Sequence, residues 1–398
     1  MITDKKQIKK TALLFMLLYM VSYITRINYG AIISEMVSET SFSKALLSMA
    51  LTGSFITYGA GQIISGICGD RFPPKKLILL GLTVTALMNL IIPICHNPYQ
   101  MLVVWCINGF AQAFMWPPLV KLMTSLFSEE DYNKASVTIS WGSSCGTIIV
   151  YFLAPFIISV SGWRAVFITS AIFGIIMAII WCFRCPNVNA ERTIRKTKSG
   201  EKQRIFTPVL IMIMIAIILQ GMLRDGVTTW MPSYISETYN LSNVISILTG
   251  VIMPLFGILS YQIASHLYRR KLNNPPVCAA TIFSIGTIAA LALYFITGRN
   301  AAISVILSAL LTGAMHGVNL ILICYVPSFF RKSGSISTIS GILNSCTYIG
   351  SAISTYSIAV ISEKTSWNFA IIVWFITALL GTAFCFASIK PWKKEHNN

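Results

Sequence analysis

Twelve long apolar segments, separated by short polar loops, dominate this 398-residue chain and limit what it can fold into. Each is about as long as the roughly 20 residues that an α-helix needs to cross a bilayer. They occupy residues 11–34, 44–68, 76–95, 100–123, 134–160, 163–184, 208–235, 242–268, 276–297, 301–326, 333–361 and 367–389. The chain is 55% hydrophobic and 11% charged, which leaves too little charged surface for a water-soluble protein. The sequence therefore predicts an all-α integral membrane protein with twelve transmembrane helices.

The only long polar interruption is residues 185–206, CPNVNAERTIRKTKSGEKQRIF. It is rich in Lys, Arg, Ser and Asn, which is typical of a flexible or surface-lying linker. We expect it to join an N-terminal six-helix half, residues 1–184, to a C-terminal six-helix half, residues 207–398. The two halves are expected to be pseudo-symmetric. Because each can pack against the other, a monomer is expected.

The basic residues are distributed unevenly among the loops. Residues at the ends of a segment are counted with the adjoining loop. Of 30 Lys and Arg residues, three then lie inside apolar segments (Arg26, Lys121, Arg224) and four lie in one set of alternate loops (Lys44, Arg164, Arg299, Lys364). The remaining 23 lie at the termini and in the other loops. This positive-inside pattern predicts a protein of the cytoplasmic (inner) membrane with both termini in the cytoplasm. It also explains the net charge of +17 by contact with the lipid bilayer, so no nucleic-acid partner is expected.

Arg26 and Arg224 lie at matching depths in two apolar segments, one in each predicted half. A charge near the bilayer centre costs at least about 2.5–3.5 kcal/mol, so such a residue usually faces a cavity. Guanidinium stays charged and presents a planar fork that suits carboxylate or phosphate. We therefore expect the two arginines to bind a small anionic substrate at the interface of the repeats.

Tyrosines accompany the first arginine on one helix face. Tyr19 and Tyr23 are spaced i, i+4, and Arg26 follows at i+7. Asp225 follows Arg224 directly and points roughly 100° away from it on a helix, so it is not expected simply to neutralise its neighbour. Asp225 instead pairs with another group, carries a proton or faces water in the cavity.

Two further residues are polar inside apolar segments. His316 either binds substrate or titrates during transport, or it makes an interhelical hydrogen bond. Asp225 and His316 are therefore the candidates for ion coupling. Lys121 is expected to extend its amine to the cytoplasmic surface. Trp116, Pro117 and Pro118 are expected to break and bend segment 100–123.

Sequence signals for catalysis or metal binding are lacking. The ten cysteines lie mostly inside apolar segments, with no C-x-x-C pair and no His/Cys ligand spacing. No enzymatic nucleophile or phosphate-cradling glycine loop is present. We expect no enzyme activity, no cofactor, no metal and no disulfide framework.

The loop between the second and third segments, GICGDRFPPKK, runs from Gly66 to Lys76. Asp70 could pair there with Arg71 or with a cation on a neighbouring helix, so Asp70 and Arg71 are candidates for a cytoplasmic gate. The pattern G-x-x-x-D-R followed by basic residues resembles the helix 2–3 loop of the major facilitator superfamily. With twelve segments, a six-plus-six division and a basic linker, the resemblance covers the whole chain. It implies the major facilitator fold, in which the two halves rock about a central site.

A narrower resemblance links YMVSYITRINYGA, GMLRDGVTTWMPSYISE and the W-P-P region to the organophosphate:phosphate antiporters, the glycerol-3-phosphate and sugar-phosphate permeases. The family's phosphate-contacting arginines match Arg26 and Arg224. Its cavity tyrosines match Tyr19, Tyr23, Tyr58 and Tyr348. The family's other polar residues have changed: a lysine matches Gln62, a histidine Cys145, a tyrosine His316 and an acidic residue Thr229. The resemblance implies a substrate-binding set of the two arginines, the four tyrosines, Gln62 and His316.

These observations predict a secondary active transporter of a small organic anion, a phosphate ester or a sugar acid, that exchanges it against phosphate. Two unoccupied facing cations repel, which disfavours an empty return. One alternative is a proton-coupled symporter of organic carboxylates. Another is a transporter-like membrane sensor of sugar phosphate, because the family resembled includes a receptor-like member. Multidrug efflux is a weaker alternative, because two arginines would not favour lipophilic cations.

Overall fold

The computed structural model describes residues 2, 4–40, 42, 44–186, 206–241, 252–330 and 336–396. Throughout this part of the chain the regular structure is helical, without strands. A described helix overlaps each of the twelve predicted segments, so the all-α prediction is confirmed. The predicted linker 185–206 lies almost wholly outside the described residues, as does the start of segment 242–268.

Two compact units can be distinguished by their internal contacts. One comprises Met1–Gln203 with Pro327–Ser345, and the other comprises Arg204–Val326 with Cys346–Asn398. Helix α16 (Ile336–Lys364) contributes residues 336–345 to the first unit and its remainder to the second. The division into halves 1–184 and 207–398 stays a prediction.

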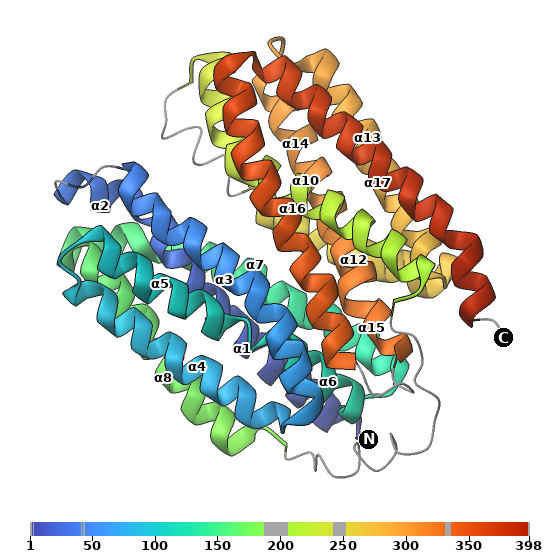
Figure 1. Ribbon diagram of the computed structural model, residues 1–398, viewed down its shortest axis with the longest axis horizontal. Helices are drawn as coiled ribbons and strands as arrows, with labels where there is room; N and C mark the ends of the chain where they lie inside the picture. The colour runs from blue at the N-terminus through green and yellow to red at the C-terminus, as the bar shows by residue number, and fades with distance from the viewer. Residues whose placement is uncertain are drawn as a thin grey trace. The chain divides into compact units, whose positions relative to one another are not determined.

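Helices α1 to α8 belong to the first unit (Figure 1). Their bounds are α1 Lys5–Ala31, α2 Ile33–Glu39, α3 Lys44–Arg71, α4 Pro74–Ile91, η1 Ile92–Ile94, α5 Pro98–Gln112, α6 Trp116–Leu126, α7 Glu129–Ser161 and α8 Trp163–Arg184. Helix α1 packs on α7 and α8, and α3 packs on α5 and α6. The predicted break at the W-P-P element is present, because α5 ends at Gln112 and α6 begins at Trp116.

The second unit is organised around α10 and α14. Its helices are α10 Pro208–Tyr239, α12 Ile252–Leu267, η2 Tyr268–Leu272, α13 Pro275–Ile296, α14 Ala301–Asn319, η3 Leu320–Tyr325 and α17 Trp367–His396, together with most of α16. The short helix α15 (Val326–Phe329) belongs to the first unit except for Val326. Helix α14 packs on α10, α12 and α13, and α17 packs on α10 and α13. The segments η2 and η3 are π-helical, a rare form that occurs frequently at functional sites.

Polar side chains define where many helices begin. Helices α1, α5, α7, α10, α13 and α14 start after side chains that accept a backbone N–H of the first turn: Asp4, Asn97, Ser128, Thr207, Asn274 and Asn300. Such caps stabilise a helix by about 1 kcal/mol. Between α7 and α8 the chain turns at Gly162, whose φ of 73° lies in the region that glycine adopts most readily.

The outer surfaces of both units are strongly apolar. Among the described residues, nine helical segments are long and apolar enough to cross a membrane. Large apolar side chains are exposed, such as Phe152 (79%), Phe183 (83%) and Ile288 (67%). Exposure on this scale is typical of a surface covered by lipid.

Candidate functional site

Arg26 lies against aromatic rings in the first unit. Its Cζ atom is 4.2 Å from the ring centroid of Tyr23 and 4.8 Å from that of Tyr58. Tyr23 comes from the same helix, whereas Tyr58 comes from α3 and is only 3% exposed. A cation over such a face gains about 0.5–2 kcal/mol, more when water is excluded. The rings therefore fix the guanidinium between α1 and α3.

The aromatic surface continues along α1. The Tyr19 ring centroid lies 5.3 Å from that of Tyr23 and 5.0 Å from that of Trp116, the first residue of α6. Tyr19, Tyr23 and Arg26 thus lie in one stripe, as their spacing predicts. The stripe is bounded by α3 and α6.

A buried polar network holds another face of α1. Ser22 Oγ donates to Gln112 Oε1 at 2.8 Å, and Gln112 Nε2 donates to Thr25 Oγ1 at 2.9 Å. The amides of Asn89 and Asn108 donate to the Thr25 carbonyl at 3.0 Å and 3.3 Å. All five side chains are buried. Because the network joins α1 to α4 and α5, it fixes the rotation of α1 and hence the direction of Arg26.

Gln62 lies one helical turn after Tyr58 on α3 and is fully buried. Its Oε1 accepts a hydrogen bond from Asn344 Nδ2 of α16 at 3.0 Å. Next to it, a Cβ on Gly66 would lie 2.7 Å from the Ser337 carbonyl oxygen, so only glycine allows this approach. The structure places Gln62 between α3 and the start of α16, and its role towards substrate stays a prediction.

Asp70, near the end of α3, binds the first turn of α16. Its Oδ1 accepts from the Ser337 backbone N–H at 3.1 Å, and its Oδ2 accepts from the Thr338 N–H at 2.8 Å and hydroxyl at 2.6 Å. A carboxylate is favourable there because helix N-termini carry unsatisfied donors and a positive partial charge.

Lys121 of α6 is the cation beside this carboxylate. Its Nζ atom donates to the Asp70 carbonyl oxygen at 2.8 Å and lies 3.5 Å from Asp70 Oδ1. Only 6% of Lys121 is exposed, so the prediction that its amine reaches the surface is wrong. The acidic partner compensates for its burial. Arg71, the other proposed gate residue, is exposed at the end of α3.

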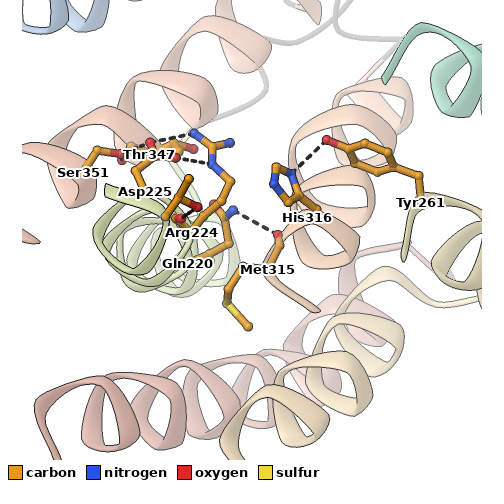
Figure 2. Close-up of polar contacts among 9 residues, drawn as sticks. Gln220, Arg224, Asp225, Tyr261, Met315, His316, Thr347 and Ser351 are labelled. Carbon is orange, nitrogen blue, oxygen red and sulfur yellow. Dashed lines mark hydrogen bonds and ion pairs between the residues drawn. The ribbon is translucent and has the colours of Figure 1, made fainter. Parts of the chain in front are cut away.

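Arg224 and Asp225 form a bidentate ion pair in the second unit (Figure 2). Arg224 Nε donates to Asp225 Oδ1 at 2.7 Å, and Nη2 donates to Oδ2 at 2.9 Å. The prediction that Asp225 would not neutralise its neighbour is therefore wrong. Adjacent helical residues diverge at Cβ, but the long arginine side chain bends around the helix to reach the carboxylate.

Three further side chains extend this ion pair. Ser351 Oγ of α16 hydrogen-bonds Asp225 Oδ2 and also donates to the Thr347 carbonyl at 2.9 Å. His316 of α14 interacts electrostatically with both members of the pair. The His316 Nδ1 lies 3.0 Å from the hydroxyl of Tyr261, which comes from α12 (Figure 2). His316 thus makes an interhelical hydrogen bond, which is one of the two roles that its sequence position predicts.

Close backbone packing brings Ser351 within reach of Asp225. A Cβ on Gly221 of α10 would collide with the Thr347 carbonyl oxygen, and one on Gly350 of α16 would collide with that of Ile218. Small residues let the two helices touch along their backbones, as membrane helices often do.

The structure gathers the predicted residues into three groups. The first group, on α1 and α3, comprises Tyr19, Tyr23, Arg26, Tyr58 and Gln62. The second group, on α10 and α14, comprises Arg224, Asp225 and His316. The third is Asp70, near the end of α3. Tyr348 is half-buried on α16, three residues before Ser351, and Thr229 is exposed one turn after Asp225.

Sequence reasoning missed Ser351, Tyr261 and Thr338, because ordinary hydroxyl residues give no signal until a partner is located. Among the described residues, no group of three His, Cys, Asp or Glu could hold a metal ion. All ten cysteines are free thiols.

Comparison with known proteins matches residues 15–355 to the model of the Major Facilitator Superfamily. The chain is 22% identical over 403 residues to a probable hexose phosphate transport protein of Chlamydia muridarum, covering 92% of this chain and 87% of that protein. It is 21% identical over 290 residues to the membrane sensor protein UhpC of Escherichia coli, covering 67% and 66%. Among solved structures, the E. coli fucose:proton symporter FucP has a TM-score of 0.74 at 14% identity, covering 96% of this chain and 99% of FucP.

The FucP likeness confirms the fold, and the family match covers most of the chain, including Arg26, Asp70 and Arg224. The chain is an integral membrane protein that belongs to the Major Facilitator Superfamily, and it resembles the organophosphate transporters within that superfamily.

Proposed function

We propose that this protein is a secondary transporter that carries a small organic anion across the cytoplasmic membrane in exchange for phosphate. The proposal rests mainly on the position of Arg26, whose guanidinium lies against the rings of Tyr23 and Tyr58 on an otherwise apolar helix. A charge retained there at a cost of several kcal/mol is best explained by an anionic ligand. The halves rock between two states, and both termini face the cytoplasm.

Each predicted half supplies one guanidinium, Arg26 or Arg224, to the same anion. Tyr19, Tyr23 and Tyr58 contribute aromatic surface and hydroxyl groups around Arg26, and Tyr348, Gln62 and His316 complete the substrate-binding set. Asp70 and Arg71 form the cytoplasmic gate. The bond from Asp70 to the first turn of α16 supports this role, because breaking it would release the helix end.

Phosphate esters are the first substrates to test. The relative from Chlamydia muridarum is a probable hexose phosphate transport protein, and a planar guanidinium fork suits phosphate oxygens. Sugar acids carry a carboxylate that the same fork can bind.

The test is exchange in proteoliposomes loaded with phosphate and supplied with radiolabelled phosphate outside. We expect exchange by the parent protein, near-complete loss in Arg26→Ala and partial loss in Arg26→Lys, which keeps the charge but not the fork. Arg299→Ala, which removes an exposed loop arginine, is the matched control and should exchange normally. Equal exchange by Arg26→Ala and the parent would contradict the proposal.

A proton-coupled carboxylate symporter is the second candidate. It is favoured by two titratable groups near Arg224: Asp225, which forms an ion pair with it, and His316, which interacts with it electrostatically. Uptake of a carboxylate driven by an imposed pH gradient, and lost in Asp225→Asn, would support it. Unchanged coupling in both Asp225→Asn and His316→Gln would count against it.

A membrane sensor is the third candidate, because one relative is the sensor protein UhpC. A sensor would bind hexose phosphate without moving it. Saturable binding to purified protein, combined with no flux from correctly inserted protein, would support a sensor and contradict transport.

A further inference from the structure

The Arg224–Asp225 ion pair raises a problem for anion binding. Asp225 occupies Nε and one Nη of the guanidinium, which is one of the two edges that can bind a carboxylate or phosphate in bidentate fashion. With the carboxylate in place the pair has no net charge, so an arriving anion meets a dipole instead of a cation. Arg224 is 12% exposed and Asp225 31% exposed, so Asp225 is the more accessible member to water.

Resting on the proposed function, we propose that Asp225 is the resident counter-ion of Arg224. An anion binds Arg224 by replacing this carboxylate, which accepts a proton from water as it leaves. The O–H bond forms on an Asp225 carboxyl oxygen, and the two N–H···O bonds to Asp225 give way to two N–H···O bonds to the anion. The pair has no net charge before binding, and Arg224 with a monoanion beside a neutral Asp225 has none afterwards.

Ser351 fits both protonation states of Asp225. Its hydroxyl hydrogen-bonds Asp225 Oδ2 and lies 2.9 Å from the Thr347 carbonyl oxygen. Towards an ionised Asp225 the hydroxyl donates to the carboxylate. Towards a protonated Asp225 it can accept the acid's O–H and donate its own hydrogen to Thr347. No hydrogen bond at Ser351 is lost when the proton arrives.

The groups that face Asp225 are Arg224 on its own helix, His316 on α14 and Ser351 on α16. Arg224 stays charged throughout, and Ser351 does not titrate. His316 is the other group that could take the proton, but its hydrogen bond from Nδ1 goes to the hydroxyl of Tyr261, and replacement of the carboxylate at Arg224 leaves that bond in place. Asp225 alone exchanges one partner for another when an anion binds, which assigns the proton to it.

Thermodynamic linkage determines how the affinity for the anion changes with pH. If a proton enters with the anion, affinity for the anion rises as pH falls, and anion binding draws protons from solution by the same coupling. A transporter that works this way carries one proton with each anion on the same stroke.

The experiment uses inorganic phosphate as the probe and compares the parent with Asp225→Asn, which is close in shape but takes up no proton. We expect Asp225→Asn to bind phosphate about tenfold more tightly at neutral pH, because the competing carboxylate is gone. Its affinity should vary less with pH than that of the parent. In weakly buffered solution, the parent should take up about one proton more per bound phosphate than the variant. Phosphate's own titration is common to both proteins and cancels in the difference.

One matched control keeps the result specific. Glu237→Gln makes the same carboxyl-to-amide change near the end of α10, where Glu237 accepts from Trp367 Nε1, and it should match the parent. Equal affinity and equal proton uptake in the parent and Asp225→Asn would overturn the counter-ion proposal while leaving Arg26-dependent exchange intact. Absence of phosphate exchange by the parent would instead contradict the proposed function.

Discussion

Asp70 and Thr338 are separated by 268 positions in the sequence, yet Asp70 Oδ2 accepts both the backbone N–H and the hydroxyl of Thr338. The carboxylate is thus a helix cap supplied by a distant helix. The segment from Gly66 to Lys76 is therefore more than a basic loop, because its acidic residue, Asp70, caps the beginning of α16.

Replacing Asp70 by Ala should destabilise the first unit. The loss of a capping side chain costs about 0.5–2 kcal/mol, and the buried Lys121 amine loses its acidic partner. We expect a lower midpoint in thermal unfolding of the detergent-solubilised protein. Arg71→Ala, which changes the exposed neighbour, should unfold like the parent. The same midpoint for Asp70→Ala and Arg71→Ala would show that the cap contributes nothing.

Tyr58 should act through its ring and not its hydroxyl. Tyr58→Phe keeps the face beneath Arg26, so phosphate exchange should retain most of its rate. Tyr58→Leu removes a cation–π contact of about 0.5–2 kcal/mol, so the KM for phosphate should rise by roughly 2- to 30-fold. Initial exchange rates over a range of phosphate concentrations give the maximal rate and the KM of both variants. Loss of activity in the Phe variant as large as in the Leu variant would assign the role to the hydroxyl.

Gly350 should not tolerate a side chain. A Cβ there would collide with the Ile218 carbonyl oxygen, and overpacking of a tight helix contact costs about 1–3 kcal/mol. We expect Gly350→Ala to lower the unfolding midpoint and to weaken the hydrogen bond between Ser351 and Asp225. Gly30→Ala is the control, because a Cβ there meets Leu51 at an ordinary 3.6 Å. The prediction fails if the two variants unfold at the same temperature.

Gln112 should matter for both stability and substrate affinity. Gln112→Leu removes the acceptor of the buried Ser22 hydroxyl and the amide that donates to Thr25, at a cost of about 1–3 kcal/mol. Because the network sets the rotation of α1, the KM for phosphate should also rise. Gln7→Leu, at an exposed position of α1, is the control. A stable variant with an unchanged KM would show that α1 is oriented by other contacts.

Much of the fold could be predicted from the sequence, because a bilayer forces the backbone into helices and apolar length reveals them. The bend at Trp116–Pro118 was predictable because proline cannot continue the backbone hydrogen bonds. The stripe of Tyr19, Tyr23 and Arg26 followed from helical spacing alone.

The errors share one physical cause. The predictions for Lys121 and Asp225 depend only on their positions along a helix, whereas the environment of each side chain is set by partners that spacing does not reveal. Lys121 is buried because a carboxylate from another helix compensates it. Arg224 reaches Asp225 because an arginine side chain is long enough to override the angle between adjacent Cβ atoms.

The two arginines also differ in how they can enter the membrane. Arg224 brings its counter-charge on the next residue, so α10 can insert with its charge already balanced. Arg26 meets the ring of Tyr23 on its own helix, but its second ring, Tyr58, lies on a helix that follows later in the chain. The aromatic surroundings of Arg26 are thus complete only after α3 has also entered the bilayer, whereas the charge of Arg224 is balanced within one helix.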